Sequence, residues 1–187
     1  KEVFVTKDND RFLYCYKDIE DKILFEENKK NVPNEADFFE INTMIKKVIK
    51  DISIFLKKNN GICLFIDYGY SKGYGNTLQA VKNHEYVDPL SFPGNSDLTS
   101  HINFSHINNE TKKLGMNFFG PITQRNFLIN LGAIERLEIL KKSTNSEKIK
   151  NDLEEGLNRV IGNSQMGELF KVCAISPKNK LIPEGFD

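Results

Sequence analysis

An unbroken run of five apolar residues, 62–66, constrains the fold of this chain more than any other feature. A strand with one face in water alternates apolar and polar residues. The unbroken run therefore predicts a strand buried on both faces, as in a parallel sheet covered by helices. A buried helix would also account for it, but the short length and the bounding Gly61 and Gly69 favour a strand. We expect residues 62–66 to form the central strand of an α/β protein.

Asp67 comes directly after this run and is followed by Tyr68. In open α/β sheets, ligands bind at the carboxyl ends of the strands, which makes Asp67 the best candidate for a functional side chain. An aspartate at the end of a strand also often accepts backbone hydrogen bonds from the next turn. The residues alone leave these two interpretations equally open.

The first third of the chain predicts strands and then a helix. Residues 1–36 predict a hairpin or small meander of three short strands, over 2–6, 11–16 and 22–26, followed by a polar loop. Residues 37–68 predict an amphipathic helix over 38–58, because apolar residues recur there with a period of 3.6, and then the central strand.

The last part of the chain, residues 104–187, predicts further helices and strands. Its apolar periodicity indicates a helix that ends at Gly115, one over 127–140 that is interrupted or bent at Gly132, and one over 149–161. Short apolar runs predict strands over 116–119, ended by Gly120 and Pro121, and over 169–175. Helices that alternate with strands indicate an α/β fold in one domain.

The connection over 69–103 is rich in glycine and shows little periodicity. Connections of this length inside a compact domain are usually functional or have structure of their own, so we interpret it as a lid or a substrate-binding excursion. Its glycines lack the Gly-Lys-Ser/Thr ending of a phosphate-binding loop and do not match the dinucleotide fingerprint. His84, Asp97 and Thr99 lie in this segment as candidate contacts, although each is typical of a surface or turn position as well.

Composition excludes several classes of function. Lys plus Arg and Asp plus Glu each number 26, and zero net charge argues against non-specific nucleic-acid binding. No apolar run approaches the roughly 20 residues of a membrane span, so we expect no membrane insertion. Cys15, Cys63 and Cys173 are far apart in sequence and predict core packing rather than a disulfide framework or a zinc site. The three histidines have no spacing that suits a metal ion.

Several short segments, in this order, together resemble one family. They are Asp67-Tyr-Gly-Tyr70, Thr77-Leu-Gln-Ala-Val81 with His84, Pro93-Gly94, Asp97-Leu-Thr99 with His101 and Phe104, Gly120-Pro-Ile-Thr-Gln124 with Phe127-Leu128, and Met166-Gly-Glu-Leu-Phe-Lys171. Over residues 60–187 the chain looks like the C-terminal half of the MidA-type S-adenosylmethionine-dependent methyltransferases. That family includes a mitochondrial protein-arginine methyltransferase linked to assembly of respiratory complex I. Asn76 and Asn103 stand where the family tends to have Asp, and Arg125 where it usually has Gly.

The resemblance implies a Rossmann-like class I methyltransferase fold with a lid insertion. In that fold the 62–66 strand is the fifth strand, and 169–175 is the final antiparallel strand beside it. The glycine loop and the acidic residue that hold S-adenosylmethionine belong to the family's N-terminal half and are not visible in this sequence. By resemblance, then, the chain is half of an enzyme, whose cofactor contacts lie outside it.

The resemblance also implies roles for individual residues. Asp67 would be the catalytic carboxylate that orients an arginine of a protein substrate. The substrate-binding candidates are Tyr68, His84, Asp97, Thr99 and Gln124, and Gln124 could instead cap the helix near Phe127. Localisation would be the bacterial cytoplasm or the mitochondrial matrix, and a homodimer stays open. A non-catalytic protein-binding or assembly module is the alternative, because the cofactor half is not visible and two Asp positions carry Asn.

Overall fold

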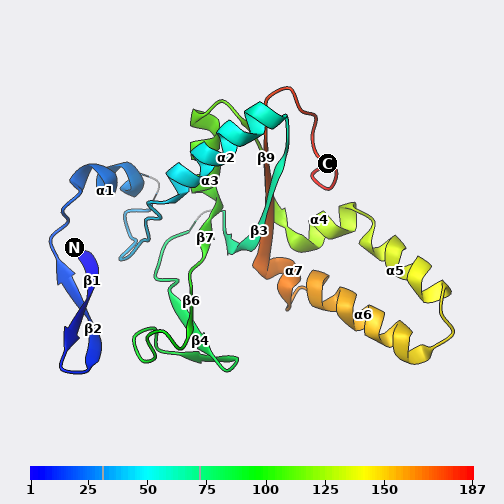
Figure 1. The fold of residues 1–187 in the computed structure, drawn as a ribbon, viewed down its shortest axis with the longest axis horizontal. Coiled ribbons are helices and arrows are strands. Elements are labelled where there is room, and N and C mark those ends of the chain that lie inside the picture. The colour runs from blue at the N-terminus through cyan, green and yellow to red at the C-terminus, as the bar shows by residue number, and fades with distance from the viewer. Residues whose placement is uncertain (31, 72) are drawn as a thin grey trace. The chain divides into compact units, whose positions relative to one another are not determined.

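The computed structural model describes residues 1–30, 32–71 and 73–187. Asn31, in the predicted polar loop, and Lys72, in the glycine-rich part of the predicted lid, lie outside the described residues. The chain forms two compact units, one of Lys1–Asn42 and Gly73–His101, the other of Thr43–Lys72 and Ile102–Asp187 (Figure 1).

The first unit contains three antiparallel pairings of short strands and one helix. Its elements are β1 (Glu2–Asp8), β2 (Arg11–Lys17), α1 (Lys22–Lys29), β4 (Gln79–Lys82), β5 (Glu85–Val87) and β6 (Asp97–Thr99). The hairpin predicted at the start of the chain is confirmed, since β1 pairs with β2 from Glu2 opposite Lys17 to Asp8 opposite Arg11. The excursion has structure of its own, a small sheet in the order β5-β4-β6.

The prediction of a third strand over 22–26 is wrong, because these residues belong to α1. Asp21 caps this helix, and its Oδ1 accepts a hydrogen bond from the Leu24 amide at 2.8 Å. A side-chain acceptor at this position satisfies one of the free N–H groups of the first turn and so favours a helix over a strand. The apolar residues of the segment are too few to override that local signal.

The second unit is built on a four-stranded sheet. Its elements are α2 (Ile45–Asn59), β3 (Cys63–Tyr70), β7 (Ile102–Asn103), α3 (Phe104–Lys113), β8 (Asn117–Thr123), α4 (Gln124–Asn130), α5 (Ala133–Lys142), α6 (Glu147–Ile161), α7 (Met166–Leu169) and β9 (Phe170–Ser176). The sheet order is β7-β3-β9-β8, with β9 antiparallel to both of its neighbours and β7 parallel to β3. The predicted antiparallel strand beside the central strand is therefore confirmed.

Two boundaries in this unit differ from the prediction, and one predicted interruption is confirmed. The helix predicted from 38 begins at Ile45, because the segment before it bonds elsewhere: the Phe38 carbonyl accepts from the Gly75 amide at 2.9 Å. The strand predicted to stop at Gly120 continues through a register shift to Thr123. The predicted interruption at Gly132 is confirmed, since α4 and α5 are separate helices and Gly132 has a φ of 81°.

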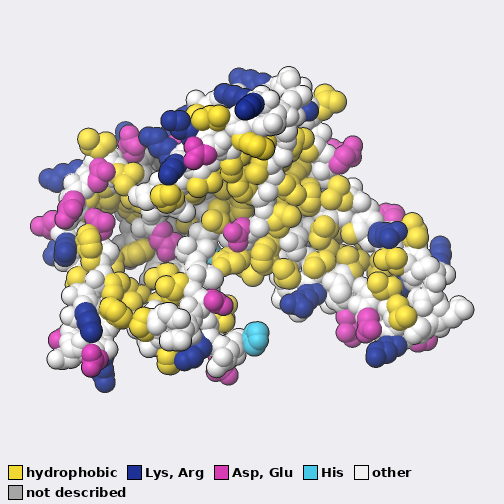
Figure 2. Space-filling model, in the orientation of Figure 1, with side chains coloured by type: hydrophobic (Ala, Val, Ile, Leu, Met, Phe, Trp, Pro, Cys, Tyr) yellow, Lys and Arg dark blue, Asp and Glu magenta, His cyan; other side chains and the backbone are white. Residues whose placement is uncertain are grey.

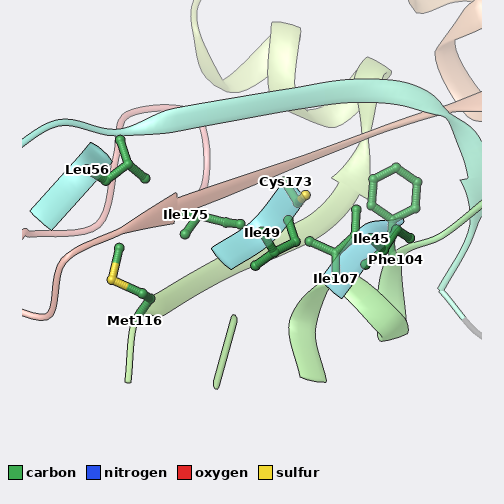
Figure 3. Packing of buried hydrophobic residues seen from close by; sticks show 8 residues of the cluster. All are labelled: Ile45, Ile49, Leu56, Phe104, Ile107, Met116, Cys173 and Ile175. Carbon is green, nitrogen blue, oxygen red and sulfur yellow. The ribbon is translucent and has the colours of Figure 1, made fainter. Parts of the chain in front are cut away.

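One face of the sheet carries the main hydrophobic core. Ile49 of α2 and Phe104 and Ile107 of α3 pack on Cys173 and Ile175 of β9, and all five side chains are buried (Figure 3). The buried residues of α2 recur at helical spacing, so one face of that helix meets the sheet while its lysines stay in water. This confirms the amphipathic helix that leads into the central strand.

The expectation that the central strand is buried on both faces is wrong. Ile62, Leu64 and Ile66 are 47%, 44% and 46% exposed, whereas Cys63 and Phe65 are half-buried against the core. The helices α2 and α3 cover only the face that carries Cys63 and Phe65. Figure 2 shows hydrophobic side chains gathered where Figure 1 draws β3.

Within the described residues of the second unit, the opposite face is covered over β8 and β9 but not over β3. There the Phe186 ring lies 6.3 Å from that of Phe119 and 5.2 Å from that of Phe127, measured between centroids. Val172 and Ala174 of β9 are fully buried on this face. In the residues that the structure describes, no helix is long and apolar enough to cross a membrane.

Candidate active site

Asp67 lies within β3 rather than past its end, because the strand continues to Tyr70. It stands opposite Lys171 of β9 and is half-buried. Its Oδ1 accepts a hydrogen bond from the Tyr68 amide at 2.8 Å. Its Oδ2 has no hydrogen-bond or ion-pair partner among the described residues. One oxygen thus holds the local backbone, as the non-catalytic interpretation expects, and the other is available to a ligand.

Tyr68 is oriented by an aromatic neighbour on the next strand. It stands opposite Phe170 in the β3–β9 ladder, and the two rings meet edge to face at 5.6 Å between centroids and 82° between planes. Edge-to-face pairs of this kind are favourable beyond their buried area. The Tyr68 ring is therefore held by the sheet itself, on the face opposite to that of Asp67.

Gln124 holds two helices together. It is buried as the first residue of α4, and its Nε2 donates to the Val160 carbonyl near the end of α6 at 2.8 Å. The neighbouring Arg125 donates to the Ile161 carbonyl at 2.8 Å. These bonds satisfy carbonyls that the last turn of a helix leaves free. The cap of α4 is Thr123, whose Oγ1 accepts from the Asn126 amide, so the suggestion that Gln124 caps this helix is wrong.

His84 lies at the tip of a tight hairpin. Asn83 and His84 link β4 to β5, and both have positive φ, 51° and 65°. Two successive residues in this conformation are typical of the two-residue turns that match the twist of a hairpin. His84 is exposed at this turn.

Asp97 and Thr99 lie together on one face of the small sheet of the first unit. They occupy alternate positions of β6, opposite Val81 and Gln79 of β4. Asp97 is exposed and Thr99 is half-buried. The structure therefore sorts the candidate residues into two sets: Asp67, Tyr68 and Gln124 in the second unit, and His84, Asp97 and Thr99 in the first.

Sequence reasoning missed the side chain that anchors the excursion. Glu40 accepts from the Thr77 amide with Oε1 at 2.8 Å and from the Thr77 hydroxyl with Oε2 at 2.5 Å. Thr77 Oγ1 in turn accepts from the His101 amide at 2.9 Å. The sequence predicts a helix at Glu40, and no sequence signal marks a contact between residues so far apart in the chain.

Asn103 caps α3, and an asparagine directly before a helix is a typical sequence signal of such a cap. Its Oδ1 caps α3 by accepting from the Ser105 and His106 amides at 3.1 and 3.3 Å. Asn and Asp cap helices about equally well. Asn103 therefore keeps the cap at a position where the family tends to have Asp.

The thiols of the sheet are packing groups. Burial, with a smaller contribution from Cys63, raises the pKa of Cys173 to about 12, and burial also raises the pKa of Cys63. A protonated thiol is a poor nucleophile, so neither side chain is poised for covalent chemistry at neutral pH. Among the residues described, no group of three or more His, Cys, Asp or Glu side chains could hold a metal ion.

The described residues of the glycine-rich segment 69–75 do not form a cofactor cradle. A Cβ on Gly69 would lie 2.1 Å from the Ile102 carbonyl oxygen, so this glycine permits close pairing of β3 with β7. The segment leads into the strand β4, whereas phosphate and dinucleotide loops lead into the N-terminus of a helix. The described residues of this segment therefore do not fit S-adenosylmethionine.

Comparison with known proteins extends this description. Residues 1–122 match the profile of the S-adenosyl-L-methionine-dependent methyltransferase family. The protein arginine methyltransferase NDUFAF7 homolog, mitochondrial, of Caenorhabditis elegans is 35% identical over 141 residues, 74% of this chain and 31% of the relative. The human protein arginine methyltransferase NDUFAF7, mitochondrial, is 29% identical over 134 residues, 72% of this chain and 30% of the relative.

Solved structures share the fold. A native crystal structure of an uncharacterised protein from Burkholderia thailandensis is 25% identical, with a TM-score of 0.81 over 99% of this chain and 49% of that one. A second Burkholderia thailandensis structure, bound to S-adenosyl-homocysteine, is 24% identical, with a TM-score of 0.77 over 99% of this chain and 47% of the other. The chain thus spans about a third of the curated relatives and half of these solved chains. Its fold is the Rossmann-like α/β fold of these neighbours, and the chain belongs to the S-adenosyl-L-methionine-dependent methyltransferase family.

Proposed function

We propose that this chain is the acceptor-side part of an S-adenosylmethionine-dependent methyltransferase that methylates arginine in a protein substrate. The observation that supports this most is the free Oδ2 of Asp67 in β3, within a chain of this family. The choice of arginine as the substrate residue rests on the names of the relatives, which are protein arginine methyltransferases.

The chemistry of arginine explains why a carboxylate would be needed. A guanidinium is protonated throughout the physiological range and is an obligate donor, so the enzyme must orient it and favour loss of its proton. Asp67 would do this through Oδ2 with one charge-assisted hydrogen bond, and Tyr68 would form a wall of the pocket. Because Oδ1 already accepts from the Tyr68 amide, the bond to the guanidinium would come from Oδ2.

The remaining candidate residues would bind the protein substrate. His84, Asp97 and Thr99 would be substrate contacts on the excursion, and Gln124 would be a substrate contact on α4. S-adenosylmethionine supplies the methyl group when bound. Its binding residues would belong to the remainder of the family's fold, since the described residues of the glycine-rich segment do not fit it.

A second candidate function is a non-catalytic module that binds or assembles a partner protein. The exposed Tyr86 and Leu98 of the excursion favour it, at 78% and 59%. By resemblance the partner would belong to respiratory complex I. The relatives are mitochondrial, so the matrix is the proposed compartment, with the bacterial cytoplasm as the alternative and a homodimer open for either.

Two measurements test the proposed function. Calorimetry should detect no micromolar binding of S-adenosylmethionine to the 187-residue chain alone. A polypeptide that contains this chain and spans the length of the family should transfer radiolabelled methyl groups to an arginine peptide but not to its lysine counterpart. Micromolar binding by the chain alone would contradict the proposal that the cofactor-binding residues lie outside this chain. Cofactor binding without transfer to any arginine substrate would favour the assembly module.

A further inference from the structure

Helix α2 is basic although the whole chain is neutral. It carries five lysines and one aspartate, whereas the 187 residues together have no net charge. Figure 2 shows Lys and Arg side chains gathered over the helix that Figure 1 labels α2, with hydrophobic side chains between them. The positive charge is therefore a local feature of one surface and not a property of the protein as a whole.

One side of α2 faces away from the sheet. The buried residues of the helix, among them Ile49, lie on the side that packs on the core. Side chains three or four positions apart share one face of a helix. On the side opposite the core such side chains form an exposed row, which we call the outer stripe: Lys47, Lys50, Asp51, Ile54 and Lys58. The outer stripe therefore belongs to the surface and takes no part in the packing of the second unit.

The first lysines of α2 are not placed to stabilise the helix. Lys46 and Lys47 lie in its first turn, where the helix dipole favours acidic side chains, and α2 has none there. Lys46 and Lys50 are four positions apart, a spacing at which like charges repel each other. In the part of the chain that the structure describes, these three lysines have no hydrogen-bond or ion-pair partner. The stability of the fold does not account for these charges, which favours a role in binding an anionic partner.

Two large apolar side chains lie among the lysines. Ile54, on the outer stripe, is 58% exposed, and the adjacent Phe55 is 65% exposed. A lysine can lay its alkyl stem along an apolar surface while its ammonium group stays in water. Lysines around exposed Ile and Phe are typical of helices that bind the surface of a membrane, because the apolar side chains enter the headgroup boundary and the cations attract anionic lipids.

We propose that the outer stripe of α2 binds the surface of an anionic lipid bilayer, with Ile54 and Phe55 in the headgroup boundary and Lys47, Lys50 and Lys58 at the lipid phosphates and carboxylates. Charge complementarity identifies the partner as an anion. Every cation of α2 is a lysine, whereas the anchors of protein interfaces are mostly Trp, Tyr and Arg, and lysine is depleted there. This composition favours a bilayer over an acidic protein. Methyl transfer does not enter the inference, so it does not depend on the proposed function.

Sedimentation with lipid vesicles tests the inference. The 187-residue chain should bind vesicles of phosphatidylcholine that contain about one third phosphatidylserine, roughly tenfold more tightly than vesicles of phosphatidylcholine alone. The binding should weaken when the salt concentration rises from about 0.05 to about 0.5 M, because salt screens the attraction between exposed charges. Equal binding to both kinds of vesicle, or binding to neither, would overturn the inference.

Two matched pairs of variants locate the surface. Lys47→Glu and Lys148→Glu each place a carboxylate in the first turn of a 15-residue helix, where it suits the dipole, so both variants should fold. Only Lys47→Glu should weaken binding to the anionic vesicles, by about tenfold. Ile54→Ser should also weaken it, whereas Ile139→Ser should not, although Ile139 on α5 is 60% exposed. Equal binding within either pair would overturn the inference.

Other polyanions distinguish a bilayer from an acidic macromolecule. Polyglutamate and heparin present negative charge without an apolar layer, so at equal charge concentration they should bind the chain more weakly than the anionic vesicles do. If either bound as tightly as the vesicles, the partner would be an acidic protein or a nucleic acid and the inference would be wrong. The polypeptide that spans the length of the family should show the same preference for anionic vesicles, and loss of that preference would also overturn the inference.

Discussion

Lys171 stands directly opposite Asp67 in the β3–β9 ladder, yet its ammonium group donates to the Glu168 carbonyl and not to the Asp67 carboxylate. An ion pair across the ladder would have tied Asp67 to a structural role. Its absence among the described residues leaves a half-buried carboxylate with one unbonded oxygen.

Replacing Asp67 separates its two interactions. Asp67→Asn keeps an oxygen for the Tyr68 amide, so the free energy of unfolding should change little, while the charge toward a substrate is lost. One interaction that acts in the transition state is worth roughly 2–4 kcal/mol, so methyl transfer by the full-length enzyme should fall about a hundred- to a thousandfold. Asp67→Ala should show the same loss of rate and, in addition, about 1 kcal/mol of destabilisation. A fully active Asp67→Asn enzyme would exclude Asp67 from catalysis.

Gly69 should not tolerate a side chain. The Cβ of Gly69→Ala would lie 2.1 Å from the Ile102 carbonyl oxygen and 2.8 Å from the Ile102 nitrogen, and backbone atoms in a strand pair cannot move away easily. We expect a loss of roughly 3 kcal/mol in chemical denaturation. Gly156→Ala is the control, because its Cβ meets nothing within 4 Å on α6 and should stabilise by about 0.5–1 kcal/mol. Equal stabilities of the two variants would contradict the close pairing of β3 and β7.

Glu40 should determine how firmly the start of the excursion is held. Glu40→Gln replaces one of the two oxygens that accept from Thr77 by a donor, so the protection of the Thr77 amide against hydrogen exchange should fall by about 1–2 kcal/mol. Glu35→Gln removes an exposed carboxylate nearby in sequence and should leave that protection unchanged. Identical exchange in both variants would show that the segment is held by other contacts.

His106 should make the second unit less stable in mild acid. Burial lowers the pKa of His106 despite the nearby Glu110, so the unfolded chain binds a proton more readily than the folded one. Stability should therefore be highest above pH 6.5, the ordinary histidine value, and fall as the pH drops below it, by at most about 1.4 kcal/mol per pH unit. His106→Gln should fall less steeply between pH 7.5 and 5.5. Parallel curves for the two proteins would exclude His106 as the cause.

Much of the fold was predictable because its signals are local. The periodicity of α2, α3 and α6 and the resemblance around Met166–Lys171 predicted the helices and the antiparallel β9. The wrong predictions, the strand over 22–26 and the start of α2, depend on interactions that the apolar pattern does not show. Residues 22–26, predicted as a strand, form a helix because the Asp21 side chain caps its first turn. Residues 37–44 do not join α2 because Phe38 and Glu40 accept hydrogen bonds from Gly75 and Thr77, which lie far along the chain.

The candidate site was predictable only in part. Asp67 and Tyr68 could be chosen because they follow an apolar run, but the apolar run itself was misinterpreted as buried on both faces. A run of apolar residues indicates that their side chains favour burial, but it does not show whether other residues of the same chain bury them. The exposed Leu64 and Ile66 are the result of that difference.

The buried thiol of Cys173, in the middle of the sheet, can report transient opening of the sheet. Cys173 is fully buried between β3 and β8, and its raised pKa keeps it protonated at neutral pH. An alkylating reagent can reach its sulfur only when the strands on either side separate. The rate of labelling at Cys173, compared with that of the more accessible Cys15, would then report how often the centre of the sheet comes apart.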